Sequence, residues 1–160
     1  MNPELVFLLE AALIGVIAVV ATNLDNLLLS VNLVQVDGIK RATGVFFSIQ
    51  VLVILLALGL SQGLEGFPGH WLAYLGILPI SLGVFELVRK AEDMVVPASI
   101  GVLQSSLLLA ANSGDSLAVL MVTFSDVSEK YDLVTAIGAG MAAVTLTAVL
   151  VVLSTRSFTE

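Results

Sequence analysis

Residues 17–31 read IAVVATNLDNLLLSV, so one carboxylate, Asp25, and its neighbouring carboxamides interrupt an otherwise apolar stretch. Residues 107–121 read LLLAANSGDSLAVLM and place Asp115 in the same kind of stretch, 90 positions later. An aspartate at the centre of a membrane helix costs about 2.5–3.5 kcal/mol on insertion scales, so such a residue marks a functional site by default. The matched pair predicts an ion site built from the two halves of an internal duplication.

The composition is that of a membrane protein. Of the 160 residues, 58% are hydrophobic and only 12% are charged, whereas soluble domains carry about 25% charged residues. Because backbone polar groups in lipid must pair within their own segment, the apolar stretches are predicted to be helices. A span needs roughly 20 apolar residues. The sequence therefore predicts a single all-α membrane domain over residues 1–160, a polytopic bundle of five spans at residues 5–36, 42–60, 71–88, 98–125 and 133–153.

The basic residues predict the orientation. If the spans alternate, five of the six Lys and Arg residues lie on one side of the membrane and only Lys130 lies on the other. The positive-inside rule then places the N-terminus outside and the C-terminus in the cytoplasm. The five residues on the cytoplasmic side are Lys40, Arg41, Arg89, Lys90 and Arg156.

This orientation makes the first and fourth spans antiparallel. A three-span repeat unit inverts when it is duplicated, so we expect an inverted repeat about an axis in the membrane plane. Residues 1–90 form the first repeat with three spans, and residues 91–160 form the second with two, without a sixth span. Ser113 and Gly114 favour a helix break beside Asp115, and broken helices are expected in spans 1 and 4. Both aspartates fall near the midplane by residue count.

The motifs A-T-N-L-D-N at residues 21–26 and A-N-S-G-D-S at residues 111–116 resemble those of the cadmium resistance transporter family, within the lysine-exporter superfamily. The resemblance implies a small bacterial inner-membrane exporter of two three-helix repeats. Ser116 departs from the pattern, because an amide or acid is expected there. The cation-binding positions that the resemblance implies are Asn23, Asp25, Asn26, Asn112, Asp115 and Ser116.

The transported ion is less well defined by the residues. All the candidate ligands are hard oxygens, which suit manganese, calcium or magnesium better than a soft ion, whereas the resemblance implies cadmium. Two carboxylates neutralise one divalent charge and therefore favour a divalent cation. Binding of the cation and loss of protons from the aspartates are linked, so proton exchange is a further expectation. No resident cofactor is expected.

Functions other than export fit the sequence less well. In an intramembrane aspartyl protease, Tyr and Gly-x-Gly precede the two aspartates, but here Leu24 and Asn112 stand in two of those places, so an enzyme is not predicted. A non-transporting assembly or scaffold protein, a half-transporter that works as a homodimer and an amino-acid exporter stay open. Without a basic patch, nucleic-acid binding is not expected. Partners are the lipid bilayer and the cation.

Several polar and small residues have structural alternatives. The two aspartates could serve only as interhelical hydrogen-bonding groups, and the three asparagines could act as helix-break or cap residues. Gln50, a lone amide in the second span, is expected to make a packing hydrogen bond, with a place along the ion pathway as the alternative. Gly59, Gly63 and Gly138 are expected where helices approach closely.

Overall fold

The computed structural model describes residues 2–64 and 102–157, and these are almost entirely helical. No strand occurs in these two ranges, which confirms the expected all-helical class. The third expected span, residues 71–88, lies outside the described residues, so the count of five spans and the repeat boundary stay predictions. The helices are α1 (Pro3–Thr22), α2 (Leu24–Asp37), α3 (Ile39–Leu64), α6 (Val102–Asn112), α7 (Gly114–Asp126) and α8 (Glu129–Ser157).

The helices are long and apolar enough for a membrane protein. Within the described residues, three helical segments have the length and composition of a membrane span: Pro3–Thr22, Ile39–Gly63 and Glu129–Thr155. The pair α6 and α7 makes a fourth candidate if it counts as one broken span, with a bend of 53° between its halves. The apolar stretches of the sequence therefore form helices that are long enough to cross a membrane.

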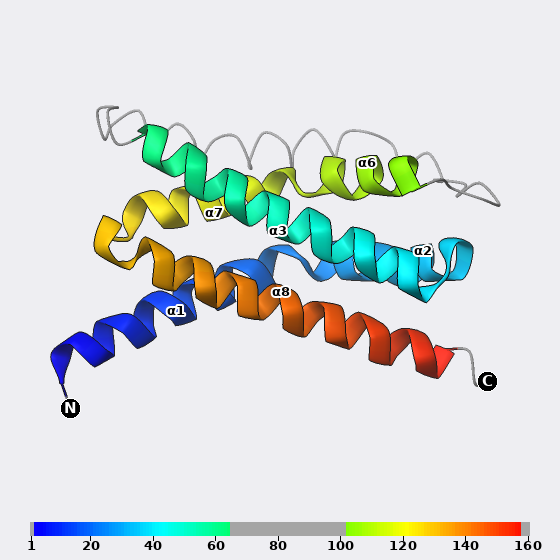
Figure 1. Ribbon diagram of the computed structural model, residues 1–160, viewed down its shortest axis with the longest axis horizontal. Coiled ribbons are helices and arrows are strands. Elements are labelled where there is room, and N and C mark those ends of the chain that lie inside the picture. Colours follow the sequence, from blue (N-terminus) through cyan, green and yellow to red (C-terminus); the bar gives the residue numbers. More distant parts are fainter. Residues whose placement is uncertain (1, 65–101, 158–160) are drawn as a thin grey trace.

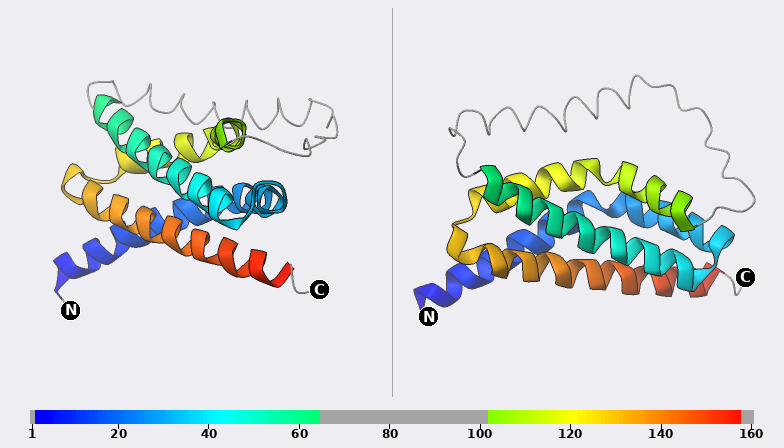
Figure 2. Two further views of the ribbon diagram at one scale, coloured as in Figure 1. Left: turned by 45° about the vertical axis from the view of Figure 1, so that its right-hand side comes forward. Right: turned by 45° about the horizontal axis from the view of Figure 1, so that its top comes forward.

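The broken helices run in opposite directions through the bundle. In Figure 1 the chain passes from α1 to α2 in one direction and from α6 to α7 in the other, and Figure 2 shows the same order in two further views. Helices α3 and α8 are likewise opposed. A tight connection at Gly38 joins α2 to α3, and its φ of 80° lies in the region that glycine adopts most readily.

The contacts between helices follow a reciprocal pattern. Exchanging α1, α2 and α3 for α6, α7 and α8 converts the α1–α8 contact into α3–α6 and the α1–α7 contact into α2–α6. The same exchange relates α2–α8 to α3–α7 and α2–α3 to α7–α8, while α3–α8 maps onto itself. Each of these contacts between described helices therefore has a counterpart, although α1–α8 is much more extensive than α3–α6 and α2–α3 more than α7–α8.

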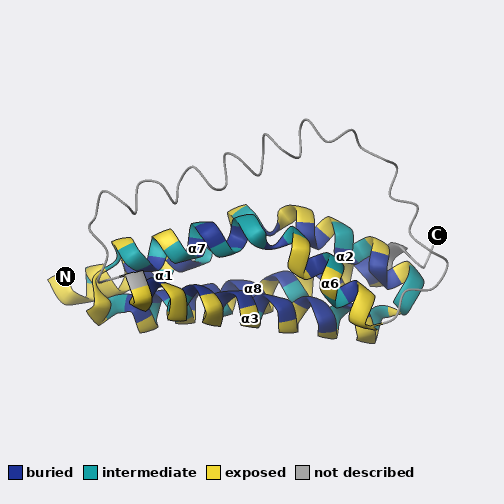
Figure 3. Ribbon diagram, turned by 90° about the horizontal axis from the view of Figure 1, so that it is seen from above, coloured by how far each residue is buried: buried dark blue, intermediate teal, exposed yellow. Residues whose placement is uncertain are grey.

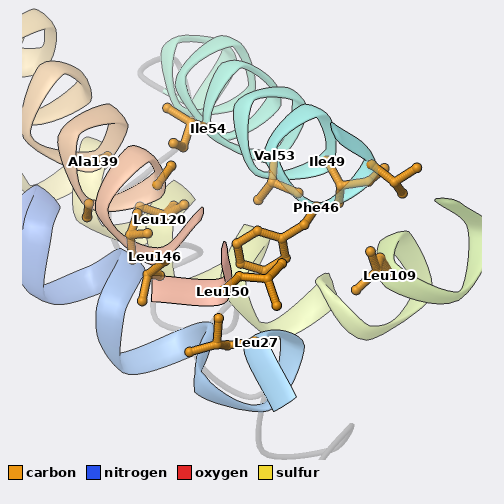
Figure 4. Close-up of a cluster of buried hydrophobic side chains, with 14 of the residues drawn as sticks. Leu27, Phe46, Ile49, Val53, Ile54, Leu109, Leu120, Ala139, Leu146 and Leu150 are labelled. Atoms are coloured by element: carbon orange, nitrogen blue, oxygen red, sulfur yellow. The ribbon is translucent and has the colours of Figure 1, made fainter. Parts of the chain in front are cut away.

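The apolar core lies where the six described helices meet. Figure 4 shows side chains of α2, α3, α6, α7 and α8 directed into one cluster, and the outward faces of the helices carry most of the exposed residues (Figure 3). Exposed leucines and valines are expected where a surface faces lipid. The central side chains, all buried, are Leu27, Phe46, Leu109, Leu120 and Leu150.

Helices α1 and α8 pack backbone against backbone. A Cβ atom on Gly15 would lie 2.1 Å from the carbonyl oxygen of Thr135, and one on Gly138 would lie 2.1 Å from that of Ala12. Close approach at Gly138 is therefore confirmed. At Gly59 and Gly63 no described residue lies within 4 Å of an added Cβ, so close approach there is not seen among residues 2–64 and 102–157.

Candidate functional site

Each helix break is made by the side chain of the residue between the two halves. The Nδ2 of Asn23 donates to the carbonyl oxygen of Val19 at 2.9 Å, and the Oγ of Ser113 donates to that of Leu109 at 2.7 Å. Each side chain therefore bonds the i−4 carbonyl that a continuing helix would give to the backbone. The backbone N–H groups of Asn23 and Ser113 turn instead to the carbonyls at i−3.

The two breaks contact each other through their side chains. Asn112, the last residue of α6, donates from Nδ2 to Asn26 Oδ1 at 2.8 Å and to Asp25 Oδ2 at 3.1 Å. The motif residues, which are 86 and 87 positions apart in sequence, therefore form one polar cluster in space. The expectation that the two motifs meet agrees with this geometry.

The hydrogen bonds across the cluster are reciprocal. The Nδ2 of Asn26 donates to Ser113 Oγ at 3.2 Å. Replacing each residue by the one 90 positions away gives the pair Ser116 and Asn23, and there the Ser116 Oγ donates to Asn23 Oδ1 at 3.4 Å.

A second pair of bonds joins corresponding positions, but with the donor and the acceptor exchanged. The Asn112–Asn26 bond corresponds, 90 positions on, to Thr22 and Ser116. The Ser116 Oγ donates to the backbone carbonyl oxygen of Thr22 at 3.0 Å, whereas Asn112, at the position that corresponds to Thr22, is itself the donor to Asn26. The two motifs therefore occupy corresponding places in the cluster, although Ser116 has a hydroxyl where Asn26 has an amide and the two donate in different directions.

Asn23 is the central acceptor of the cluster and is fully buried. Its Oδ1 accepts hydrogen bonds from Asn26, Gln50 and Ser116. Its Nδ2 donates to Val19 and to Thr22 Oγ1. A buried amide with all its groups satisfied holds the surrounding helices in register, and a cation could reach Asn23 Oδ1 only by displacing one of these donors.

The two carboxylates lie at the rim of this network. Asp25 is exposed and Asp115 is half-buried, whereas Asn26 and Ser116 beside them are fully buried. The Oδ1 of Asp115 accepts from the backbone N–H of Ser116 at 2.7 Å. The charges of Asp25 and Asp115 are close enough to interact, and each aspartate lies in the first turn of its helix, α2 or α7, where a helix N-terminus stabilises an anion.

All six candidate residues join one continuous hydrogen-bonded network. The chain of contacts runs from Asp115 through Ser116, Asn23, Asn26 and Asn112 to Asp25. Ser113 and Gln50 belong to it as well, although the sequence suggested a helix break for the first and, for the second, a packing contact rather than a place in the pathway. The 90-residue spacing could have identified Ser113, because it aligns with Asn23.

A metal ion at this site would depend on neutral oxygens as well as carboxylates. Within residues 2–64 and 102–157, no group of three or more His, Cys, Asp or Glu side chains is placed to hold a metal ion. Two carboxylates with amide, hydroxyl or water oxygens are the ligands that the cluster offers, and these suit hard cations.

Comparison of the chain with protein-family models, curated proteins and solved structures finds no match. The resemblance of the two motifs to the cadmium resistance transporter family therefore stays a prediction.

Proposed function

We propose that this protein is a membrane transporter that exports a divalent cation through a site between its two helix breaks. The observation that carries the proposal is the contact of Asn112 with Asp25 and Asn26, which joins the two interrupted helices inside the bundle. Interrupted helices that meet near the midplane are typical of the substrate sites of secondary transporters.

An inverted repeat of residues 1–90 and 91–160 is part of this proposal. Three features support it: the opposed directions of the broken helices (Figure 1), the matched pairs of helix contacts, and the hydrogen bonds related by a shift of 90 positions. Two equivalent halves that rock about a shared site provide alternating access to the two sides of the membrane.

The charge of the site favours a cation. At each break the C-terminal end of one helix adjoins the N-terminal end of the next, so their partial charges of about half an elementary charge largely cancel. The ionised carboxylates of Asp25 and Asp115 then leave a net charge of about −2, which one divalent cation neutralises. The hard oxygen ligands favour manganese or a similar ion, and cadmium rests on the motif resemblance.

We place the protein in a bacterial inner membrane, with the N-terminus outside and the C-terminus in the cytoplasm. The lysine and arginine bias supports the orientation, and the motif resemblance supports the compartment. Exchange of the cation for protons on the aspartates would drive export, because carboxylates bind a metal ion only after they lose their protons.

A second candidate is a membrane assembly protein in which the polar cluster only holds the helices together. The complete hydrogen bonding of Asn23 favours this alternative, because a structural network needs satisfied groups and no vacant ligand. The two candidate functions make different demands on Asp25 and Asp115. A transporter needs their negative charge to bind the cation, whereas an assembly protein does not need that charge to hold its helices together.

Efflux from reconstituted vesicles distinguishes them. Vesicles loaded with Mn²⁺ or Cd²⁺ should lose the ion when they contain the wild-type chain, and Asp25→Asn or Asp115→Asn should abolish the loss. Asp126→Asn is the matched control, because Asp126 is an exposed aspartate at the opposite end of α7. Equal amounts of inserted protein are confirmed for each variant. Full efflux through Asp25→Asn would assign that residue a structural role and exclude the proposed site.

A further inference from the structure

Gln50 of α3 brings an amide into the cluster from outside the two motifs. Its side chain is 1% exposed, and its Nε2 donates to Asn23 Oδ1. Its Oε1 is buried and has no hydrogen-bond partner among the residues that the structure describes. A buried amide oxygen without a donor is uncommon and calls for an explanation.

The orientation of the Gln50 amide follows from its neighbours. The Nδ2 of Asn23 is fixed by its bonds to Val19 and Thr22, so the Oδ1 of Asn23 must face Gln50. An oxygen accepts only from a donor, and the nitrogen end of the Gln50 amide therefore points to Asn23. Reversing the amide would set two oxygens against each other. The hydrogen bond to Asn23 therefore fixes which end of the amide faces the network, and it leaves Oε1 without a donor among the described residues.

Gln50 has no counterpart in the second half of the chain. Helices α3 and α8 begin 90 positions apart, at Ile39 and Glu129, and position 140 on α8 is Gly140. The reciprocal hydrogen bonds of the two motifs form without any amide from α8. The packing of two matched halves therefore does not explain why α3 buries an amide oxygen here.

We propose that Gln50 Oε1 is a neutral ligand of the transported cation and that it favours hard cations over soft ones. This inference rests on the proposed function. It adds one buried, fixed oxygen from α3 to the two carboxylates at the rim, and amide carbonyl oxygens are ligands of calcium, magnesium and manganese. The bound cation supplies the positive partner that Oε1 lacks, while Nε2 keeps its bond to Asn23.

A substitution that offers a sulfur ligand in place of Gln50 Oε1 tests whether this oxygen binds the cation. Gln50→Met keeps an unbranched side chain but offers a thioether, which suits Cd²⁺ better than Mn²⁺, and Gln50→Leu offers no ligand. Full-length protein in lipid nanodiscs is titrated with Mn²⁺ and, separately, with Cd²⁺. In Gln50→Leu both affinities should fall by about tenfold or more. In Gln50→Met the Mn²⁺ affinity should fall likewise while Cd²⁺ keeps most of its affinity, so the preference shifts toward Cd²⁺.

Gln35→Met is the matched control, because Gln35 is an exposed glutamine on α2, and it should leave both affinities unchanged. Size-exclusion chromatography shows whether each variant is folded. If Gln50→Leu does not fold, Gln50→Met and Gln50→Glu carry the test, since the added carboxylate should raise Mn²⁺ affinity above that of Gln50→Met. Equal Mn²⁺ affinity in those two variants, or the same ratio of Cd²⁺ to Mn²⁺ affinity in Gln50→Met and wild type, would overturn the ligand role.

The two proposals fail in different ways. Wild-type protein that binds neither Mn²⁺ nor Cd²⁺ would overturn the proposed function and the ligand role together. Binding that is lost in Asp25→Asn but unchanged in both Gln50→Met and Gln50→Leu would overturn only the ligand role of Gln50.

Discussion

Asn112 at the end of α6 donates a hydrogen bond to Asp25 in the first turn of α2, with 3.1 Å between Nδ2 and Oδ2. The same nitrogen also donates to Asn26 Oδ1 at 2.8 Å. One amide of the second broken helix thus holds the carboxylate of the first and an amide beside it. The position of Asp25 therefore depends on contact between the two halves of the chain.

Removing this amide should weaken transport without removing any charge. In Asn112→Ala the Asp25 carboxylate loses its donor from α6, and we expect Mn²⁺ efflux to slow by about 10–100-fold, as for other residues that orient ligands. Asn112→Gln keeps an amide with a longer chain and should retain more activity. The measurement is the initial rate of efflux at equal protein content. Wild-type rates in Asn112→Ala would show that Asp25 needs no partner from α6.

Asn23 should contribute more to stability than any other polar residue of the cluster. Asn23→Leu removes an acceptor of three hydrogen bonds and leaves buried donors on Asn26 and Gln50 without it. With about 0.6 kcal/mol for an average interhelical hydrogen bond in a membrane and more for the strongest, we expect a loss of about 2 kcal/mol or more in the free energy of unfolding.

Thermal or denaturant unfolding in micelles measures that loss. Asn32→Leu is the control, because Asn32 is an asparagine of α2 that is exposed, and it should unfold close to wild type. Equal stability of Asn23→Leu and Asn32→Leu would contradict a structural role for the Asn23 network.

The sequence predicted the helix breaks and the meeting of the two motifs, because both depend on local chemistry and on the 90-residue spacing. Asn23 and Ser113 compete with the backbone wherever they occur in a helix, and a costly aspartate in an apolar stretch indicates a site. The all-helical class followed from composition alone. These inferences needed no knowledge of which helices pack together.

The contacts of Gln50 and the glycines were harder to predict because they depend on helix packing. A lone amide in an apolar span does not reveal whether it faces another helix or the bundle interior, and only the packing of α3 on α2 brings Gln50 to Asn23. For the same reason the pattern at Gly59 and Gly63 suggested a contact that no described residue makes, whereas Gly15 makes one.

The contact of α1 with α8 should tolerate no side chain at Gly138. In Gly138→Ala the new Cβ meets backbone atoms of Ala12, 2.1 Å from its carbonyl oxygen, and backbone cannot move as a flexible side chain can. We expect a loss of about 1–3 kcal/mol in unfolding free energy, or more. Gly140→Ala on the same helix has open space around its Cβ, so helix propensity should stabilise it by up to about 1 kcal/mol. Comparable stability of the two variants in micelles would show that the helices are farther apart.

The last prediction concerns which ends of the helices share a side of the membrane. The ammonium group of Lys130, at the start of α8, lies 3.4 Å from a carboxylate oxygen of Glu4, at the start of α1, so residues near both should face the same compartment. Because Lys40, Arg41 and Arg156 lie at the opposite end of the bundle, and the predicted spans put Arg89 and Lys90 on that side as well, we expect this compartment to be the outside. Asn2→Cys and Ser128→Cys should react with an impermeant maleimide added to intact cells, while Gly38→Cys, in the connection between α2 and α3, should react only after the membrane is opened. Labelling of Gly38→Cys in intact cells, with protection of the other two, would show that the orientation is the reverse. Labelling of Asn2→Cys without Ser128→Cys would contradict the antiparallel arrangement of the two broken helices.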